Sequence, residues 1–307
     1  MDPLFVEDDR TTAFPPRYQE FRKLLEKQRG LMWFVHSITL ENDLADWNNL
    51  SNDERHFIKM VLAFFAASDV IVNENLEERF ISEIKPHEIQ MVYRFQAMME
   101  DIHTDVYLAL LDTFIKDAKE KTELISAAKT IPSIMKKAAW AKKWISSDRP
   151  FSHRLVAMSA VEGVLFSGSF CSIYWLKQQN KGLPGLCESN DYISRDEGLH
   201  VDTAVAIHGI LQEKIPVDTM HEILKEAVEL EIGFITEALP CGLIGINAEM
   251  MIEYIKYVAN RLVKMYEYPE LYPGIVQPFS FMDMIGLPGK TNFFEKKVSD
   301  YNHTAPA

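Results

Sequence analysis

A short motif, Glu-x-x-His, occurs twice in this chain. It covers Glu100–His103 and Glu197–His200, and it occurs nowhere else in the 307 residues. Residues i and i+3 lie on the same face of a helix, so each motif directs a carboxylate and an imidazole toward one point. Two such motifs on separate helices are half of the ligand set of a dinuclear metal site inside a four-helix bundle. The other half of that set is one carboxylate from each of two further helices.

Two isolated carboxylates in apolar stretches are the candidates for that second half. Asp69 follows a run of Phe, Ala and Ser, and Glu162 is the only charged residue of a long apolar run. Each lies on the predicted helix that precedes one of the two motifs. Four carboxylates in an apolar core carry four negative charges, which two divalent cations would balance. The alternative is that each residue is separately paired or solvated. The pattern favours a dinuclear site with one histidine on each metal and the ligands Asp69, Glu100, His103, Glu162, Glu197 and His200.

The rest of the chain has the apolar periodicity of helices joined by turns, and no two segments are typical of a strand pair. We therefore predict an all-α fold with no clear linker, a single domain over residues 1–307. The arm at 1–16 and most of 269–307 should be irregular, and one helix should begin with the capping box Ser51–Glu54. The predicted helices cover about 18–35, 51–80, 87–116, 119–129, 132–146, 152–179, 189–214, 216–240, 247–266 and, as a last short one, 291–301.

Composition excludes several classes of function. The net charge of −13 argues against a nucleic-acid partner, because phosphate binding needs clustered Lys and Arg. Cys171, Cys187 and Cys241 are too widely spaced for a redox pair and fit buried thiols in a reducing cytosol. The first residues lack the basic and apolar regions of a signal peptide, and no apolar run approaches the ~20 residues of a membrane span. We expect a cytoplasmic protein without a membrane partner.

Six stretches together carry a resemblance to a known family. They are Phe64–Asp69, Val72–Leu76, Glu100–Tyr107, Val161–Phe170, Ile193–His200 and Thr291–Lys296. The chain resembles, from about residue 17 to 301, the small, radical-generating subunit of class I ribonucleotide reductase of the eukaryotic and large-DNA-virus type. The resemblance implies a ferritin-like helical fold, a homodimer and a ribonucleoside-diphosphate reductase activity shared with a large subunit.

The resemblance also implies roles for individual residues. The six ligands would hold two iron ions that react with O₂, although this ligand set accepts manganese as well. Tyr107 would carry a stable tyrosyl radical, in an apolar pocket formed by Phe166, Phe170 and Ile193. Trp33, Asp196 and His103 would form the hydrogen-bonded relay that passes the radical toward the large subunit, which reduces ribonucleotides to deoxyribonucleotides.

Two rival interpretations remain at this point. A ferritin-like oxidase or iron-storage protein would use the same ligands, but storage needs neither Tyr107 nor the relay. A metal-free helical regulator is the other rival, and the intact ligand set counts against it. Family members usually continue past the segment matching Lys297–Tyr301 into a docking tail with a relay tyrosine. Because this sequence stops at Ala307, we expect it to assemble the centre and the radical but to support little nucleotide reduction as it stands.

Overall fold

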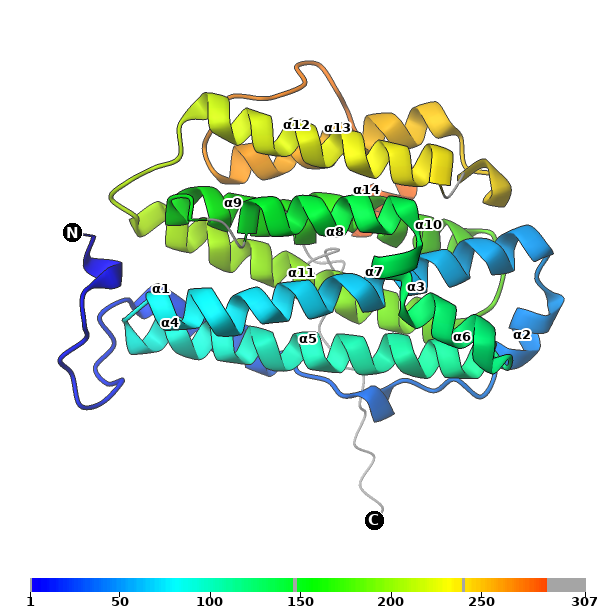
Figure 1. Cartoon of the computed structure of the whole chain (residues 1–307), viewed down its shortest axis with the longest axis horizontal. Helices are drawn as coiled ribbons and strands as arrows, with labels where there is room; N and C mark the ends of the chain where they lie inside the picture. Colours follow the sequence, from blue (N-terminus) through cyan, green and yellow to red (C-terminus); the bar gives the residue numbers. More distant parts are fainter. Residues whose placement is uncertain (1, 146–147, 239–240, 286–307) are drawn as a thin grey trace, which may run out of the picture.

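The computed structural model describes residues 2–145, 148–238 and 241–285, and all regular structure in them is helical (Figure 1). The prediction of an all-α fold is therefore confirmed. The longer helices are α1 (Gln19–Gly30), α2 (Asp43–Asn49), α3 (Asn52–Asn75), α5 (His87–Phe114), α6 (Ala118–Ile125), α8 (Pro132–Ile145), α9 (Phe151–Ala160), α10 (Ser167–Gln178), α11 (Pro184–Ile210), α12 (Val217–Gly233) and α13 (Ala248–Met265). Shorter turns of helix are η1 (Pro3–Phe5), η2 (Val35–Ser37), η3 (Leu76–Phe80), α4 (Ile81–Glu83), α7 (Ala127–Thr130), η4 (Val161–Leu165), η5 (Phe234–Ala238), η6 (Cys241–Ile244) and α14 (Ser280–Ile285).

The helices α3 and α5 lie along each other for most of their length (Figure 1). The predicted capping box begins α3: Glu54 N–H donates to Ser51 Oγ (3.1 Å), and Ser51 N–H donates to Glu54 Oε2 (2.8 Å). These bonds satisfy two amides that the first turn leaves without intrahelical partners. The middle of α3 is buried nearly all round, as its apolar sequence predicts, and this places Asp69 inside the core.

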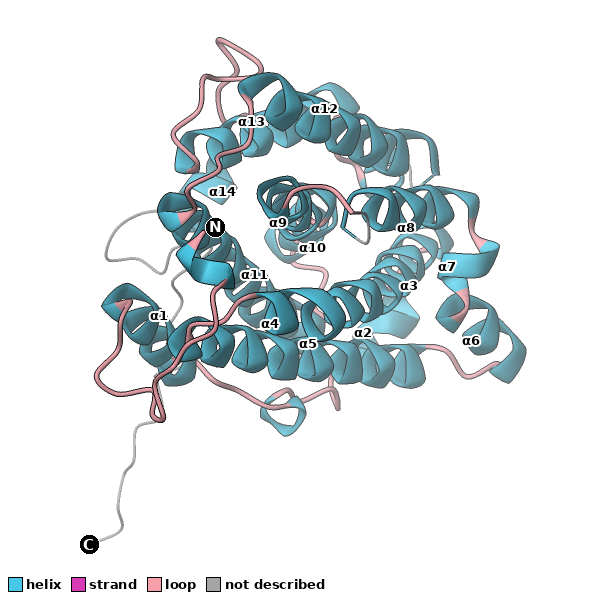
Figure 2. Ribbon diagram, turned by 60° about the vertical axis from the view of Figure 1, so that its left-hand side comes forward, coloured by secondary structure: helices cyan, strands magenta, loops and turns pink. Residues whose placement is uncertain are grey.

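The rod formed by α9, η4 and α10 lies in the middle of the helices, packed against α8, α11, α12 and α13 (Figure 2). It is one stretch interrupted by the π-helical turn η4. A helix covered on all sides needs an apolar surface all round, which explains the long apolar run around Glu162. The helices α3, α5, η4 and α11 thus meet in the interior, and all four carry predicted ligands.

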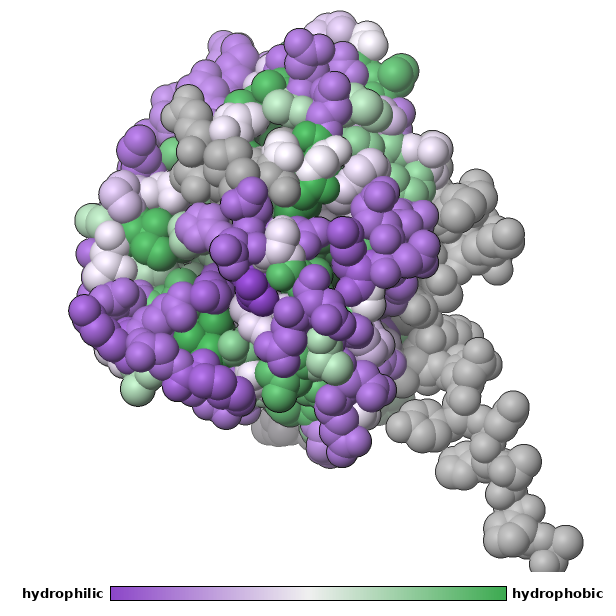
Figure 3. All heavy atoms as spheres, turned by 90° about the vertical axis from the view of Figure 1, so that its right-hand side faces the viewer, coloured by the Kyte–Doolittle hydropathy of each residue, from purple (hydrophilic) through white to green (hydrophobic). Residues whose placement is uncertain are grey.

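Two helices, Asn52–Glu83 and Phe151–Gln178, are long and apolar enough to cross a membrane by length and composition alone. By this measure the expectation that no apolar stretch approaches a membrane span is wrong. The rest of the chain, however, buries 71% and 94% of their most apolar windows. Their composition is therefore that of core helices. The face shown in Figure 3 carries mostly hydrophilic residues with small apolar patches between them.

Several predicted helix boundaries were wrong. The first helix ends at Gly30 rather than at 35, so Trp33 lies in an irregular segment before η2, and α2 was not predicted. The sequence predicted a helix from about residue 189, whereas α11 begins at Pro184. The carboxylate of Asp43 accepts the amides of Gly185 (2.9 Å) and Leu186 (2.8 Å) there, so a residue far away in the sequence caps this end.

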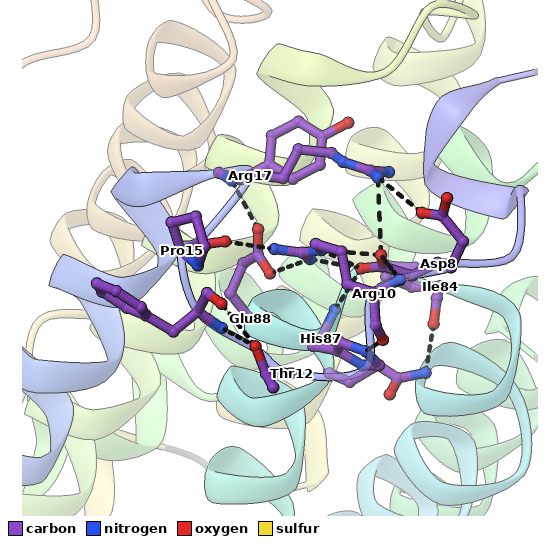
Figure 4. Close-up of polar contacts among 12 residues, drawn as sticks. Asp8, Arg10, Thr12, Pro15, Arg17, Ile84, His87 and Glu88 are labelled. Carbon is purple, nitrogen blue, oxygen red and sulfur yellow. Dashed lines mark hydrogen bonds and ion pairs between the residues drawn. The ribbon is translucent and has the colours of Figure 1, made fainter.

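The described part of the N-terminal arm is largely irregular and is joined to α5 by polar contacts (Figure 4). The guanidinium of Arg10 binds Asp8 on the arm and Glu88 on α5, with a distance of 2.6 Å to Glu88 Oε2. Glu88 also accepts the amide of Tyr18 at 2.6 Å. In the segment after 269 the structure places the short helix α14, and the last predicted helix, 291–301, lies outside the described residues.

Candidate metal centre

The six predicted ligands come from four elements and meet in the core. The helix α3 supplies Asp69, α5 supplies Glu100 and His103, η4 supplies Glu162, and α11 supplies the rest. None of the six side chains is more than 3% exposed. Within the described residues, their ligand atoms form two groups that share Glu100. One group is Asp69, Glu100 and His103, and the other is Glu100, Glu162, Glu197 and His200.

Two of the carboxylates lie between the two imidazoles. The Nδ1 atom of His103 is 3.4 Å from Glu100 Oε2 and 3.2 Å from Glu197 Oε1. The Nδ1 atom of His200 is 3.0 Å from Glu100 Oε1 and 3.2 Å from Glu197 Oε2. Each carboxylate therefore places one oxygen near each imidazole, so Glu100 and Glu197 could each contribute ligand atoms on both sides of the cluster. Glu162 Oε1 lies 3.9 Å from His200 Nδ1, so Glu162 is a terminal ligand candidate on that side.

Unsatisfied polar atoms show that the cluster fits a metal better than it fits a hydrogen-bond network. Both carboxylate oxygens of Asp69 and of Glu100, Glu197 Oε1 and His103 Nδ1 are buried without a hydrogen-bond partner. The close contacts between Glu100 and the imidazoles are within ion-pair distance but lack hydrogen-bond geometry. Buried polar atoms are nearly always satisfied in folded proteins. Six such atoms on residues of one cluster indicate a site that could bind two metal ions.

The electrostatics of the cluster point the same way. Burial raises the pKa of Asp69 and of Glu162 well above their ordinary values. Burial also acts to raise the pKa of Glu100, but His200 and His103 outweigh it and lower that pKa to about 2. The pKa of each histidine is raised well above its ordinary value because neighbouring carboxylates outweigh burial. Protons on both imidazoles and on Asp69 and Glu162 would supply four positive charges, the charge that two divalent cations bring.

A second set of residues supports the ligands from outside. The amide of Gln96 donates to Glu162 Oε1 at 2.8 Å. A hydrogen bond of 3.3 Å joins His103 Nε2 to Asp196 Oδ2, so the Nδ1 atom of this ring faces the cluster. Trp33 Nε1 donates to the same Asp196 oxygen at 2.6 Å, and Arg195 donates to Asp196 Oδ1 at 2.9 Å. Such partners fix the orientation of a ligating imidazole. Trp33, Asp196 and His103 are thus joined by hydrogen bonds.

Tyr107 lies on α5 one turn beyond His103 and is 3% exposed. Its ring stacks on Phe65, with centroids 4.9 Å apart and an interplanar angle of 10°. Phe65 in turn contacts Phe170 (4.8 Å) and Phe166 (5.4 Å). Burial raises the pKa of the Tyr107 hydroxyl well above its ordinary value, and the carboxylate of Asp69 raises it further. Ile193, the third predicted pocket residue, is buried on α11.

Sequence reasoning did not assign a site role to Phe65, Gln96 or Arg195. Phe65 precedes Asp69 by four residues and Gln96 precedes Glu100 by four, so helical spacing placed both on the ligand-bearing face. The sequence pattern indicated less about Arg195, because its role depends on contacts with residues far away in the sequence. It donates at 2.8 Å to the carbonyl of Leu31, in the loop that carries Trp33.

Comparison with known proteins gives a consistent result. The sequence model of the family "Ribonucleotide reductase, small chain" matches residues 10–278. A ribonucleoside-diphosphate reductase small chain of Arabidopsis thaliana is 49% identical over 95% of this chain and 88% of its own length. The small chain of Trypanosoma brucei brucei is 49% identical, over 98% of this chain and 89% of its own. The small chain of Variola virus is 46% identical, over 98% and 94%.

Solved structures share the fold. The ribonucleotide reductase Rnr4 homodimer of Saccharomyces cerevisiae superposes with a TM-score of 0.84 at 33% identity, covering 91% of this chain and 89% of that one. The R2 subunit of Clostridium botulinum superposes with a TM-score of 0.80 at 22% identity, covering 87% and 88%. The prediction of a ferritin-like fold of the ribonucleotide reductase type is confirmed. With the family match over most of its length, this chain belongs to the ribonucleotide reductase small-chain family and is a small subunit of ribonucleoside-diphosphate reductase.

Proposed function

We propose that this chain is the radical-generating subunit of the reductase. It holds two iron ions, uses O₂ to form a stable radical on Tyr107, and passes that radical to a large subunit that reduces ribonucleotides to deoxyribonucleotides. The observation that carries the proposal is the pair of carboxylates, Glu100 and Glu197, that each reach both imidazoles one helical turn from a buried tyrosine.

Asp69 and His103 would be terminal ligands of one ion, and Glu162 and His200 of the other, with Glu100 and Glu197 shared. When bound, the two ions supply the one-electron chemistry with O₂ that oxidises a nearby residue. Carboxylate and imidazole ligands suit iron and manganese alike, and we propose iron. The protein's own part is to hold the ligands in a site closed to bulk water.

Tyr107 would lose one electron together with its phenolic proton. The Tyr107 phenol is protonated, because burial and the nearby carboxylates raise its pKa. Phe65 stacks on its ring, and Phe166 and Phe170 pack against Phe65. We propose that these three rings, with Ile193, keep water and thiols away from the radical, because an apolar lining offers no group that reacts with it.

His103, Asp196 and Trp33 would carry the oxidising equivalent outward. Asp196 Oδ2 faces both the imidazole and the indole, so one carboxylate can exchange a proton with either ring as an electron passes. Arg195 compensates the charge of Asp196 and lowers its pKa against the effect of burial. An iron-storage protein has no need for such a chain of groups.

We further propose that the chain forms one domain and acts as a cytoplasmic homodimer with a separate large subunit. The buried apolar residues form one continuous cluster that runs from the N-terminal arm to α14, which supports the single domain. The proposal of a homodimer follows the family and the yeast homodimer of similar fold.

Electron paramagnetic resonance tests the proposal. The purified chain is reconstituted with Fe(II) and O₂, and its spectrum is compared with that of Tyr107→Phe. We expect a stable tyrosyl signal from the native chain and no stable tyrosyl signal from the variant, with two iron ions per chain in both. Full iron content without any organic radical in the native chain would contradict the proposal. An undiminished signal in Tyr107→Phe would place the radical elsewhere.

A further inference from the structure

Trp33 has a second aromatic partner besides the imidazole that leads to the cluster. Its ring centroid lies 6.0 Å from that of His103, nearly parallel at 19°, and 5.3 Å from that of Tyr192, at 45°. Trp33 itself is 1% exposed, whereas Tyr192 is only partly buried. The indole of Trp33 therefore contacts a phenol that is partly exposed to solvent. Tyr192 is thus positioned to give an electron to oxidised Trp33, which would move the oxidising equivalent from the core toward the surface.

The same tyrosine belongs to a row of polar residues on α11. Glu188, Tyr192, Asp196 and His200 recur every four residues, so they lie along one ridge of the helix. The first and last residues of the row are twelve positions apart, about 18 Å at the rise of an α-helix. His200 and Asp196 are buried, while Tyr192 and Glu188 are partly exposed. The row thus leads from the metal-ligand cluster to the protein surface.

Tyr192 also has a partner for its proton. Its hydroxyl donates to Glu188 Oε1 at 2.8 Å. Burial raises the pKa of this phenol, and the Glu188 carboxylate raises it further. The phenol is therefore protonated at neutral pH, and its oxidation releases a proton toward Glu188. The guanidinium of Arg195, 5.4 Å from the Tyr192 ring centroid, disfavours extra positive charge on that ring. Loss of the proton with the electron avoids such charge.

We propose that Tyr192 is a redox-active relay residue that takes the oxidising equivalent from Trp33, an inference that rests on the proposed function. One electron moves from the Tyr192 ring to the oxidised Trp33 ring. The phenol O–H bond breaks, and its proton forms an O–H bond on Glu188 Oε1. Trp33 is returned to its reduced form, with its Nε1 proton directed at Asp196 as in the resting structure. The radical then resides on a partly exposed tyrosine, from which a partner protein at that surface can recover it.

The test uses the full chain with the usual radical site removed. Tyr107→Phe is loaded with Fe(II), mixed with O₂ and freeze-quenched, with ordinary or ring-deuterated tyrosine incorporated. Electron paramagnetic resonance then identifies tyrosine radicals, because ring deuteration narrows only their hyperfine splitting. We expect a transient tyrosine signal that falls at least tenfold in Tyr107→Phe/Tyr192→Phe and is replaced by a longer-lived tryptophan signal. The substitution keeps the ring that packs on Trp33, so a purely structural role would leave the signal unchanged.

Two further variants complete the design. Tyr107→Phe/Tyr268→Phe is the matched control, because Tyr268 bonds the carbonyl of Ile215 on another part of the molecule, and its signal should equal that of Tyr107→Phe. Glu188→Gln, combined with Tyr107→Phe, keeps an acceptor for the hydroxyl but takes up no proton, and the tyrosine signal should fall several-fold. A tyrosine signal that survives in Tyr107→Phe/Tyr192→Phe, or a Tyr107→Phe sample without any tyrosine signal, overturns the inference.

The native chain, measured in parallel, separates this inference from the proposed function. One outcome is that the native chain forms the Tyr107 radical while the transient tyrosine signal of Tyr107→Phe is equally strong in Tyr107→Phe/Tyr192→Phe. That result would contradict only the relay role of Tyr192. Absence of the Tyr107 radical from the native chain contradicts the proposed function itself. In a chain extended by a docking tail of the family type and combined with a cognate large subunit, Tyr192→Phe should keep the Tyr107 radical content and lower deoxynucleotide formation at least tenfold, and unchanged turnover again overturns the inference.

Discussion

At the scale of single residues, Asp196 and Glu197 show how neighbours in sequence acquire different tasks. Adjacent residues on a helix point about 100° apart. Glu197 consequently faces both imidazoles, while Asp196 accepts hydrogen bonds from His103 and Trp33 outside the cluster. Helical spacing by itself is enough to show that Asp196 cannot share the direction of Glu197. The contact with Trp33 could not be derived from spacing, because Trp33 comes from a loop far away in the sequence.

Asp196→Asn tests this division of tasks. Asparagine can still accept from Trp33, but its amide carries no charge and exchanges no proton with His103. We expect the variant to bind two iron ions per chain and to form the Tyr107 radical, because no ligand is lost. Deoxynucleotide formation with the large subunit, measured on a chain extended by a docking tail of the family type, should fall by about 10- to 100-fold, the usual effect of changing an outer partner of a metal ligand. Loss of the metal ions would instead make Asp196 part of the binding site itself.

At the scale of elements, the predicted ligand Glu162 lies in the π-helical turn η4. The turn ends at a break before α10, where the carbonyl of Leu165 accepts from Lys137 Nζ (2.9 Å) and the amide of Gly168 donates to Glu231 Oε1 (2.9 Å). Lys137 and Glu231 also pair with each other, and both are buried. This ion pair between α8 and α12 satisfies the backbone groups that the break exposes. No feature of the apolar sequence around Glu162 predicts such a turn, since its partners are remote.

Gly168→Ala should disturb this support. A Cβ there would lie 2.5 Å from Glu231 Oε1 and 2.7 Å from Ile235 Cγ1, so the ion pair or the helix must move. We expect a loss of about 1–3 kcal/mol in the free energy of unfolding, together with weaker iron binding measured by anaerobic titration. Gly209→Ala, in a helix with nothing within 4 Å of the new Cβ, is the control and should be neutral or slightly stabilising. Equal effects of the two substitutions would exclude a special role for the break.

The contact between the N-terminal arm and α5 should make the free energy of unfolding depend on pH. Burial acts to raise the pKa of Glu88, but the Arg10 guanidinium outweighs it, so the pKa lies below its ordinary value of 4.5. A carboxyl group whose pKa is lower in the folded than in the unfolded state stabilises the fold at pH values above its unfolded pKa. This contribution is lost as the pH falls through the folded pKa. Glu88→Gln should therefore lower the free energy of unfolding by about 2 kcal/mol at pH 7. The difference in the free energy of unfolding between Glu88→Gln and the native chain should shrink below about pH 4.5. Chemical denaturation at pH 7 and below about pH 4.5 measures this difference.

At the scale of the whole molecule, the sequence predicted what depends on periodicity and motif spacing. The long helices α3, α5 and α13 were placed within a few residues, and the predicted ligands meet in one cluster. The start of α11, the π-helical turn η4 and the position of Trp33 were missed. Each is determined by contacts with distant segments, such as that of Asp43 with the first turn of α11. Helical spacing placed Phe65 on the face that carries Asp69, but its stacking on Tyr107 depends on a contact between two helices.

Metal should stabilise the entire fold, because the ligands converge from four elements only in the native state. A ligand that binds only the folded chain adds about 2.7 kcal/mol at a hundred times its dissociation constant. We expect anaerobic Fe(II) to raise the melting temperature and chelation to reverse the gain. Glu162→Gln should keep or raise the melting temperature of the metal-free chain, because it removes a buried acid, yet reduce the gain from Fe(II). An unchanged gain would show that Glu162 holds no metal.

Anomalous diffraction at the iron edge from iron-loaded crystals would test whether this cluster is a dinuclear metal centre. We expect two peaks per chain between the imidazoles of His103 and His200. One peak should contact Asp69, the other Glu162, and both should contact Glu100 and Glu197. A single peak, or peaks outside this set of side chains, would contradict the assignment of a dinuclear centre.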